Sequence, residues 1–290
     1  MENRMNFQTS VELPAGMPPV SHADRILLMG SCFAENIGRQ LTDAGFQLDL
    51  NPFGILYNPL SVSSALREIM GHKEYTSQDL FAYKDLWHSP MHHGSFSAFT
   101  PEETLHTINA RLHHAHQRLP ELNWLMVTLG TAYVYKQKES GQVVANCHQL
   151  PENHFLRYRL TVEEIVEDYT ALITEMAAHN PKLKWLFTVS PIRHIRDGMH
   201  ANQLSKSTLL RAFTKSKGVT PYCYLENIRI GAAKKLLEQG VAPIEADLQT
   251  GFSDQSHFTN YFNRFIGLAS GVYREIFLKG DGTGGEQHGE

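Results

Sequence analysis

The sequence lacks a disulfide framework, a long apolar run and a strong excess of charge of either sign. Its cysteines (Cys32, Cys147 and Cys223) lie far apart and include no C-x-x-C pair, which excludes a disulfide scaffold. No apolar run approaches the ~18 residues of a membrane span, and residues 1–14 contain no secretory core. A net charge of −4 implies no strong attraction of the whole chain to nucleic acid or membranes. These absences predict a soluble, cytoplasmic protein without membrane partners.

The composition is that of a folded chain with two unlike parts. Hydrophobic residues make up 42% of the 290 residues, enough for real cores, and the length suits about two domains. Residues 204–279 hold ten basic and six acidic residues, whereas the remainder holds 16 basic and 24 acidic ones. This asymmetry indicates two parts with different partners.

The first two-thirds of the chain alternates short apolar runs with amphipathic stretches. Buried strands are predicted at 25–29, 124–129 and 184–189, and helices at 33–44 and 161–179. Strands buried on both faces and separated by helices predict an α/β fold with a doubly wound parallel sheet. Ligands of such sheets bind beyond the carboxyl ends of the strands, where Gly30, Gly130 and Ser190 fall.

The last third of the chain predicts only helices. They span residues 205–217, 221–239, 242–250, 254–265 and 271–278, with glycines in the turns between them. This pattern predicts an all-α helix-turn-helix domain after the sheet. The expected domains are 1–203 and 204–279, followed by a flexible tail at 280–290.

The helix at 254–265 has two dissimilar faces. Phe258, Phe262 and Phe265 recur at helical spacing and predict an apolar face. Another face carries short polar groups of the kind that pair with base edges: Gln255, Ser256, Thr259 and Asn260. Arg264, one turn on, suits a DNA phosphate. On periodicity alone, an ordinary helical subdomain explains the same pattern.

Longer stretches of the sequence favour the DNA-contacting interpretation over an ordinary helical subdomain. Residues 204–213 read LSKSTLLRAF, residues 218–222 read GVTPY, and residues 251–258 read GFSDQSHF. Together they resemble the DNA-binding domain of the AraC/XylS regulators over about 75 residues. The resemblance implies two DNA-contacting helix-turn-helix units, which we call the first and the second reader. By this resemblance, Ser207 and Arg211 contact bases from the first reader, and the polar face just described contacts bases from the second. In the family, an apolar helix precedes the first reader and packs against it. Here residues 192–200 take its place and contain a glycine, so the first reader looks incomplete.

The turn after the first strand places a candidate nucleophile at a helix N-terminus. Gly30 is followed by Ser31 and Cys32, and the positive end of the helix there stabilises developing negative charge. Either side chain suits this chemistry. The competing interpretation is that Ser31 only caps the helix, since serine is a favoured N-cap.

Further motifs favour the chemical interpretation. GSCFA at 30–34 is followed by NPFGILYNP at 51–59, LGTAYVY at 129–135, VANCH at 144–148 and SPIRH at 190–194. These motifs resemble the GSCFA domain, which is similar to the SGNH/GDSL-like hydrolases, over roughly residues 5–212. The resemblance implies acyl-ester chemistry with Ser31 as nucleophile and with Gly54, Gly130 and Asn146 on the oxyanion side.

The general base of such a serine is not found in the sequence. The block of the family that carries it lies beyond the point where this chain turns into the helical pattern, so the hydrolase domain looks truncated. Asp254-x-x-His257 mimics the missing pair but lies within the predicted recognition helix. The clustered histidines at 88–93 and 113–116 lack the distant partners of a zinc site. We therefore expect no metal and no cofactor, and slight activity at most.

Residues 204–212 fit both resemblances, as expected where two genes have been joined. The chain is interpreted as a chimera of a truncated GSCFA domain and an AraC-type reader. The leading hypothesis is a sequence-specific transcriptional regulator that binds the major groove of double-stranded DNA. The alternatives are a serine acyl-ester hydrolase and a fusion product without function. Operator, inducer, acyl substrate and oligomeric state are left open by the sequence.

Overall fold

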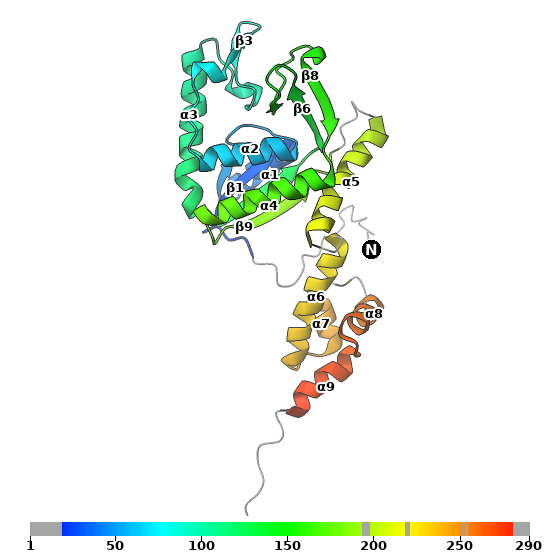
Figure 1. The fold of residues 1–290 in the computed structure, drawn as a ribbon. Coiled ribbons are helices and arrows are strands. Elements are labelled where there is room, and N and C mark those ends of the chain that lie inside the picture. The colour runs from blue at the N-terminus through cyan, green and yellow to red at the C-terminus, as the bar shows by residue number, and fades with distance from the viewer. Residues whose placement is uncertain (1–18, 193–197, 218–220, 251, 253–254, 281–290) are drawn as a thin grey trace, which may run out of the picture. The chain divides into compact units, whose positions relative to one another are not determined.

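The computed structural model describes residues 19–192, 198–217, 221–250, 252 and 255–280 (Figure 1). Its contacts divide the chain at Gly218 into two compact units. The α/β unit lies within residues 20–218, and the described helices of the second unit lie between residues 221 and 280. The predicted tail at 280–290 falls almost entirely outside the described residues.

The centre of the α/β unit is a four-stranded, all-parallel sheet in the order β2-β1-β5-β9. Its strands are β1 (Arg25–Gly30), β2 (Gln47–Leu50), β5 (Trp124–Leu129) and β9 (Lys184–Val189). The three strands predicted from apolar runs are confirmed as strands, but the burial predicted for residues 184–189 was wrong, because β9 is an edge strand with no fully buried residue. β2 was not predicted, because it is short and alternates polar with apolar residues at one edge of the sheet.

Helices cover both faces of this sheet, which confirms the doubly wound α/β class (Figure 1). α1 (Cys32–Asp43) lies over the side chains of Ile26, Leu28, Trp124 and Met126. The alternate residues of the same strands enter a larger core with α2 (Pro59–Met70), α3 (Pro101–Arg118) and α4 (Val162–His179). This division follows from the two-residue period of strand side chains.

Smaller elements surround the sheet. β3 (Phe81–Tyr83) and β4 (Leu86–His88) form a hairpin, and β6 (Tyr133–Gln137) pairs with β7 (Val143–Val144) and β8 (Phe155–Arg159). Single 3₁₀ turns lie at Ser77–Asp79, Gly94–Phe96, Leu119–Glu121 and Glu152–His154. None of these was predicted, since each is too short for its periodicity to stand out.

Helix α5 (Gly198–Lys217) packs on the α/β unit. Ser205, Leu209 and Ala212 are buried there, and the Ser205 hydroxyl accepts a hydrogen bond from Ala132 N at 2.7 Å. Lys215 also pairs with Glu163 of α4 at 2.5 Å. The boundary expected from the sequence lay at 203/204, so the structure assigns to the α/β unit a helix that was expected to belong to the reader.

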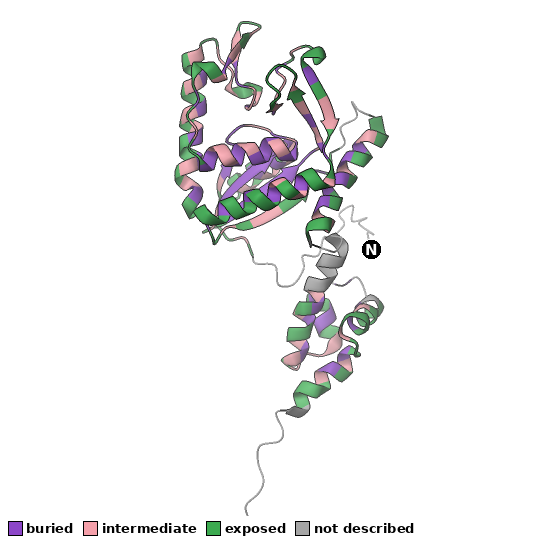
Figure 2. Cartoon of the chain, viewed as in Figure 1, coloured by how far each residue is buried: buried purple, intermediate pink, exposed green. Residues whose placement is uncertain are grey.

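The helical unit has its own core. Its helices α6 (Pro221–Glu238), α7 (Pro243–Thr250), α8 (Gln255–Ile266) and α9 (Ser270–Gly280) match the predicted helices within two residues at each end. Ile230, Leu237, Phe258 and Phe262 are completely buried together. Figure 2 shows buried segments among the helices of this unit. The Tyr273 hydroxyl donates to Glu238 Oε1 at 2.6 Å and so ties α9 to α6. Burial and this carboxylate raise the pKa of Tyr273 to about 12.

The strand β9 forms one edge of the sheet and is only partly covered. Phe187 is 36% exposed, whereas the six residues of the neighbouring strand β5 are all buried. No helix in the described part of the chain is long and apolar enough to span a membrane.

Candidate functional site

The helix α8 separates its apolar and polar residues cleanly. Phe258 and Phe262 are 0% exposed and lie in the core of the helical unit. The prediction that Phe265 shares this face was wrong, because its side chain is 53% exposed. Near the end of α8 the inward position is taken by Ile266, which packs partly buried against the same core.

The opposite face of α8 is polar and open to solvent. The five residues of α8 that were predicted to contact DNA are all exposed: Gln255, Ser256, Thr259, Asn260 and Arg264. None of their side chains forms a hydrogen bond or an ion pair within the described part of the chain. Their donors and acceptors are therefore available to an external partner.

The residues of the predicted first reader lie on α5. Ser207 and Arg211 are exposed, whereas Leu209 and Ala212 on the buried face of the helix enter the core of the α/β unit. The polar face of this helix is thus presented by the α/β unit, while α8 belongs to the helical unit.

Ser31 lies where the sequence predicted it, between the end of β1 and the first turn of α1. Its backbone N–H donates to Thr128 O at 3.1 Å, and its side chain is completely buried. The hydroxyl oxygen has no hydrogen-bond partner among the described residues, and it does not cap α1. Among the described residues, no imidazole is hydrogen-bonded to the Ser31 hydroxyl.

The backbone groups assigned to the oxyanion side are already engaged. Gly130 N–H donates to Tyr57 O at 2.7 Å, and Gly54 N–H donates to Asn51 O at 2.7 Å. Asn146 uses its side-chain oxygen to accept from His148 N at 2.9 Å, and its own N–H donates to Pro90 O. These contacts do not assemble an oxyanion hole around Ser31.

A cluster that the sequence did not predict lies at the carboxyl edge of the sheet. The Lys206 ammonium donates to Gly130 O at 2.6 Å and to Ser190 O at 2.7 Å. Burial lowers the pKa of Lys206, and the charge of nearby Cys32 opposes this effect. Burial and contact with Cys32 together raise the pKa of Tyr57. Tyr57 and Lys206 thus both lie near Cys32 at this edge of the sheet.

The histidines of the loop after β4 are structural. His92 is 1% exposed, stacks on Phe53 and shares a 2.9 Å hydrogen bond between its Nδ1 and Ser89 Oγ. His148 Nε2 lies 2.8 Å from Ser89 O. Burial lowers the pKa of His92 to about 3 and that of His148 to about 4. No group of three or more metal-binding side chains occurs among the described residues.

These two imidazoles predict that the α/β unit loses stability in acid. Their pKa values are lower in the folded state than the ordinary 6.5. Below pH 6.5 the unfolded chain therefore binds protons at these imidazoles that the folded chain does not bind, and this favours unfolding. Each imidazole should cost about 2 kcal/mol of stability between pH 7 and pH 5. Urea unfolding followed by tryptophan fluorescence measures this loss, because Trp87, Trp124 and Trp185 all lie in the α/β unit.

The matched variant is His148→Gln, which removes one of the two groups. It should lose about half of the pH dependence, while groups common to both chains cancel in the comparison. Equal pH dependence in the two chains would contradict the assignment.

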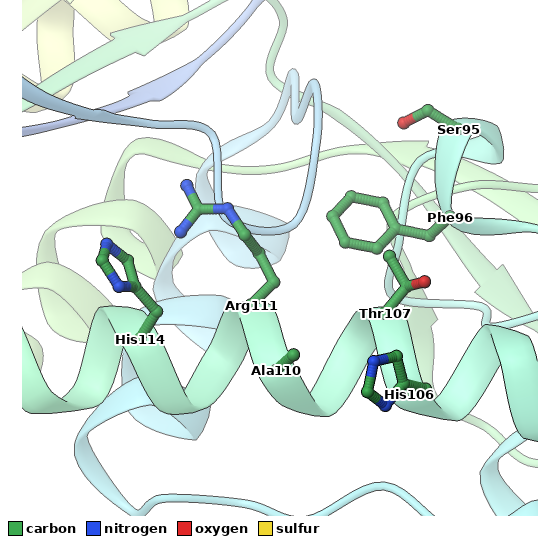
Figure 3. A pocket seen from close by; sticks show the side chains of 7 residues that line it. All are labelled: Ser95, Phe96, His106, Thr107, Ala110, Arg111 and His114. Carbon is green, nitrogen blue, oxygen red and sulfur yellow. The ribbon is translucent and has the colours of Figure 1, made fainter.

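An open hollow of about 510 Å³ lies over α3 (Figure 3). Its lining is Ser95, Phe96, His106, Thr107, Ala110, Arg111 and His114. The Arg111 guanidinium is held by the buried Asp49 carboxylate and by Leu50 O. None of the predicted site residues lines this hollow.

The geometry defines a parallel α/β unit with a serine-cysteine turn at the carboxyl edge of its sheet, joined to a helical unit. A model of the GSCFA family matches residues 25–224, more than two-thirds of the chain, and the chain belongs to this family. A helix-turn-helix domain model matches residues 200–276. Residues 200–224 are matched by both, so the fusion of the two domains runs through α5.

Known proteins resemble only part of the chain. An uncharacterized HTH-type transcriptional regulator of Bacillus subtilis, YbfI, is 59% identical over 70 residues, which cover 22% of this chain and 26% of that protein. The HTH-type transcriptional activator RhaR of Yersinia pestis is 30% identical over 126 residues, 42% of this chain and 41% of RhaR. The chain thus spans less than half the length of these relatives.

One solved structure is also similar to part of the chain. It is an AraC-type regulator from Chromobacterium violaceum, 23% identical, with a TM-score of 0.24 over 28% of this chain and 72% of that one.

Proposed function

We propose that the protein is a sequence-specific, DNA-binding transcriptional regulator of the AraC type, whose reading helix is α8. The observation that carries the proposal is the division of α8 into a buried phenylalanine face and an exposed, unpaired polar face. The helix-turn-helix match and the regulators named above support it. The major groove of B-DNA admits an α-helix and presents a distinct pattern for each base pair.

Each exposed side chain has a role in this proposal. The amides of Gln255 and Asn260 suit paired hydrogen bonds to adenine, and the hydroxyls of Ser256 and Thr259 suit either donors or acceptors on base edges. Arg264, one turn beyond Asn260, contacts a phosphate and fixes the position of the helix on the duplex. The packed core behind α8 holds these groups in one orientation, so that little entropy is lost on binding.

Ser207 and Arg211 offer a second contact surface on α5. Both are exposed, and Leu209 and Ala212 fix the helix against the α/β unit. We assign them to a second set of DNA contacts that is separate from the α8 face.

The proposal is tested by selecting binding sites from a pool of random duplexes and measuring the affinity of variants for the selected duplex. Gln255→Ala and Asn260→Ala should each weaken binding by about 1–3 kcal/mol and relax the preference at one base pair. Arg264→Ala should weaken binding to all sequences and reduce the salt slope by about one.

The matched control is Gln249→Ala, which removes another exposed glutamine, from α7. Its affinity should equal that of the unchanged chain. Selection that yields no common sequence, or losses as large for Gln249→Ala as for Gln255→Ala, would refute α8 as the reader.

The hydrolase alternative rests on Ser31, Gly54, Gly130 and Asn146. Ser31 is buried without a bonded base in the described structure, and the two glycine N–H groups are engaged. No contact among the described residues favours serine catalysis over DNA binding.

A further inference from the structure

A small hollow of about 210 Å³ lies in the α/β unit, where the turn between β8 and α4 meets α5. Its lining consists of residues 159–163 around that turn together with Thr208 and Arg211 of α5. Of the site residues predicted from the sequence, only Arg211 is part of this lining. We call the site the arginine hollow, because Arg159 and Arg211 line it from two different elements.

The charges of these two arginines are not compensated. Both residues are exposed, and neither guanidinium forms a hydrogen bond or an ion pair within the described part of the chain. Two unpaired positive charges that line one small hollow repel each other, so the arrangement favours an anion between them. Other arginines of the α/β unit pair with a carboxylate or lie over an aromatic ring: Arg25, Arg39, Arg67, Arg111 and Arg157.

The first turn of α4 carries two carboxylates close to the hollow, and both are already engaged. Glu163 Oε1 accepts a hydrogen bond from Lys215 Nζ of α5 at 2.5 Å. Glu164 Oε2 accepts from the backbone N–H and from the hydroxyl of Thr161, at 2.7 and 2.9 Å. The charge of Glu163 is thus balanced by Lys215, and the positive charge of the two arginines remains for an external anion.

Both arginines project from fixed elements. Arg159 is the last residue of β8 and lies opposite Tyr133 in the pairing of β8 with β6. Arg211 lies on α5 beside Leu209 and Ala212, which are buried in the core of the α/β unit. The backbone positions of the two arginines are therefore set before an anion arrives, which lowers the entropy lost on binding.

The chemistry of the hollow favours a phosphate group over a carboxylate. A guanidinium presents a planar fork of N–H donors that matches two oxygens of an anion. One fork is enough to occupy both oxygens of a carboxylate, whereas a phosphate group has oxygens for two forks. The volume of 210 Å³ lies below the roughly 300–1,000 Å³ of pockets that enclose a whole small molecule. The hollow therefore suits the phosphate group, with the rest of the ligand outside it.

We propose that the arginine hollow binds a phosphate group, with one guanidinium fork from Arg159 and one from Arg211. Two sources share this chemistry, a phosphate of the DNA backbone and a free phosphate compound. The DNA source rests on the proposed function and makes Arg159 a DNA contact of the α/β unit. Arg211 then contacts a phosphate rather than a base edge, so it positions the duplex without reading its sequence.

The first arm of the test measures phosphate binding without DNA. Inorganic phosphate is compared with chloride at equal ionic strength, and urea unfolding is followed by tryptophan fluorescence. An anion that binds only the folded chain raises the urea midpoint, and the general stabilisation by phosphate is common to all variants. The rise should fall by roughly half in Arg159→Ala and in Arg211→Ala. The matched control Arg39→Ala, which removes an exposed arginine from α1, should keep the full rise.

The second arm distinguishes the two sources. Binding of the selected duplex is measured over a range of salt concentrations. If the ligand is a DNA phosphate, Arg159→Ala should weaken binding about tenfold and reduce the salt slope by about one. The base preference should stay unchanged, because a phosphate contact carries no sequence information. Arg39→Ala should bind as the unchanged chain does.

Each outcome decides the proposal. A reduced salt slope in Arg159→Ala identifies the DNA backbone as the source. Loss of the phosphate effect with an unchanged slope identifies a free phosphate compound, and so does the same loss in a chain that binds no DNA, a result that refutes only the proposed function. Equal phosphate effects in Arg159→Ala, Arg211→Ala and the unchanged chain, without a reduced DNA slope, would overturn the proposal.

Discussion

Replacement of Phe262 by alanine is expected to destabilise the helical unit by about 3–5 kcal/mol. Phe262 is 0% exposed and contacts Phe258 and Tyr273, at ring-centroid distances of 5.5 and 5.7 Å. A loss of this size approaches the whole stability of a unit with so few residues. The unit should therefore be largely unfolded, and DNA binding should disappear with it.

The same helix provides the control. Phe265→Ala removes an equal side chain that is 53% exposed, and it should cost far less. Hydrogen exchange read by mass spectrometry reports the opening of α6–α9 separately from the α/β unit. Similar protection of α6–α9 in the two variants would contradict the packing described for α8.

Replacement of Gly30 by alanine is expected to destabilise the α/β unit by at least about 3 kcal/mol. Gly30 has φ +138°, and an added Cβ would lie 2.1 Å from Thr128 O on the paired strand β5. The clashing atom belongs to the backbone, so no side-chain rotation relieves it. The strands must separate, and the hydrogen bond from Ser31 N–H to Thr128 O is lost.

Gly94→Ala is the matched control in the same unit. An added Cβ at Gly94 meets nothing within 4 Å, and its backbone is not in the left-handed region. Its stability should stay within about 0.5 kcal/mol of the unchanged chain. Urea unfolding by tryptophan fluorescence measures both variants, and equal midpoints would contradict the close approach of β1 and β5.

The predictable part of the fold was the part with long, regular patterns. The apolar runs of β1, β5 and β9 all form strands of one parallel sheet, and such runs indicate strands irrespective of their neighbours. α8 was predictable because Phe258 and Phe262 fix its buried face, and the exposed residues follow from helical geometry. Phe265 was misassigned, because a helix end allows the next residue to turn inward.

The rest depended on contacts between distant segments. Lys206 lies 76 residues from Gly130, and nothing in the local sequence distinguishes it from a solvent-exposed lysine of a recognition helix. The helix that carries it fits two families equally well, so that its packing partner was decided only by the tertiary structure. The burial of His92 and His148 likewise depends on how the loops fold over Ser89.

The most direct test of the DNA-reading role of α8 is the ratio of its affinities for specific and non-specific DNA. The duplex obtained by selection and a scrambled duplex of equal length are titrated at one physiological salt concentration. The structure predicts at least about a thousandfold preference for the selected duplex, and its loss in a chain that carries both Gln255→Ala and Asn260→Ala. Equal affinity for the two duplexes, or a preference that survives both substitutions, would contradict it.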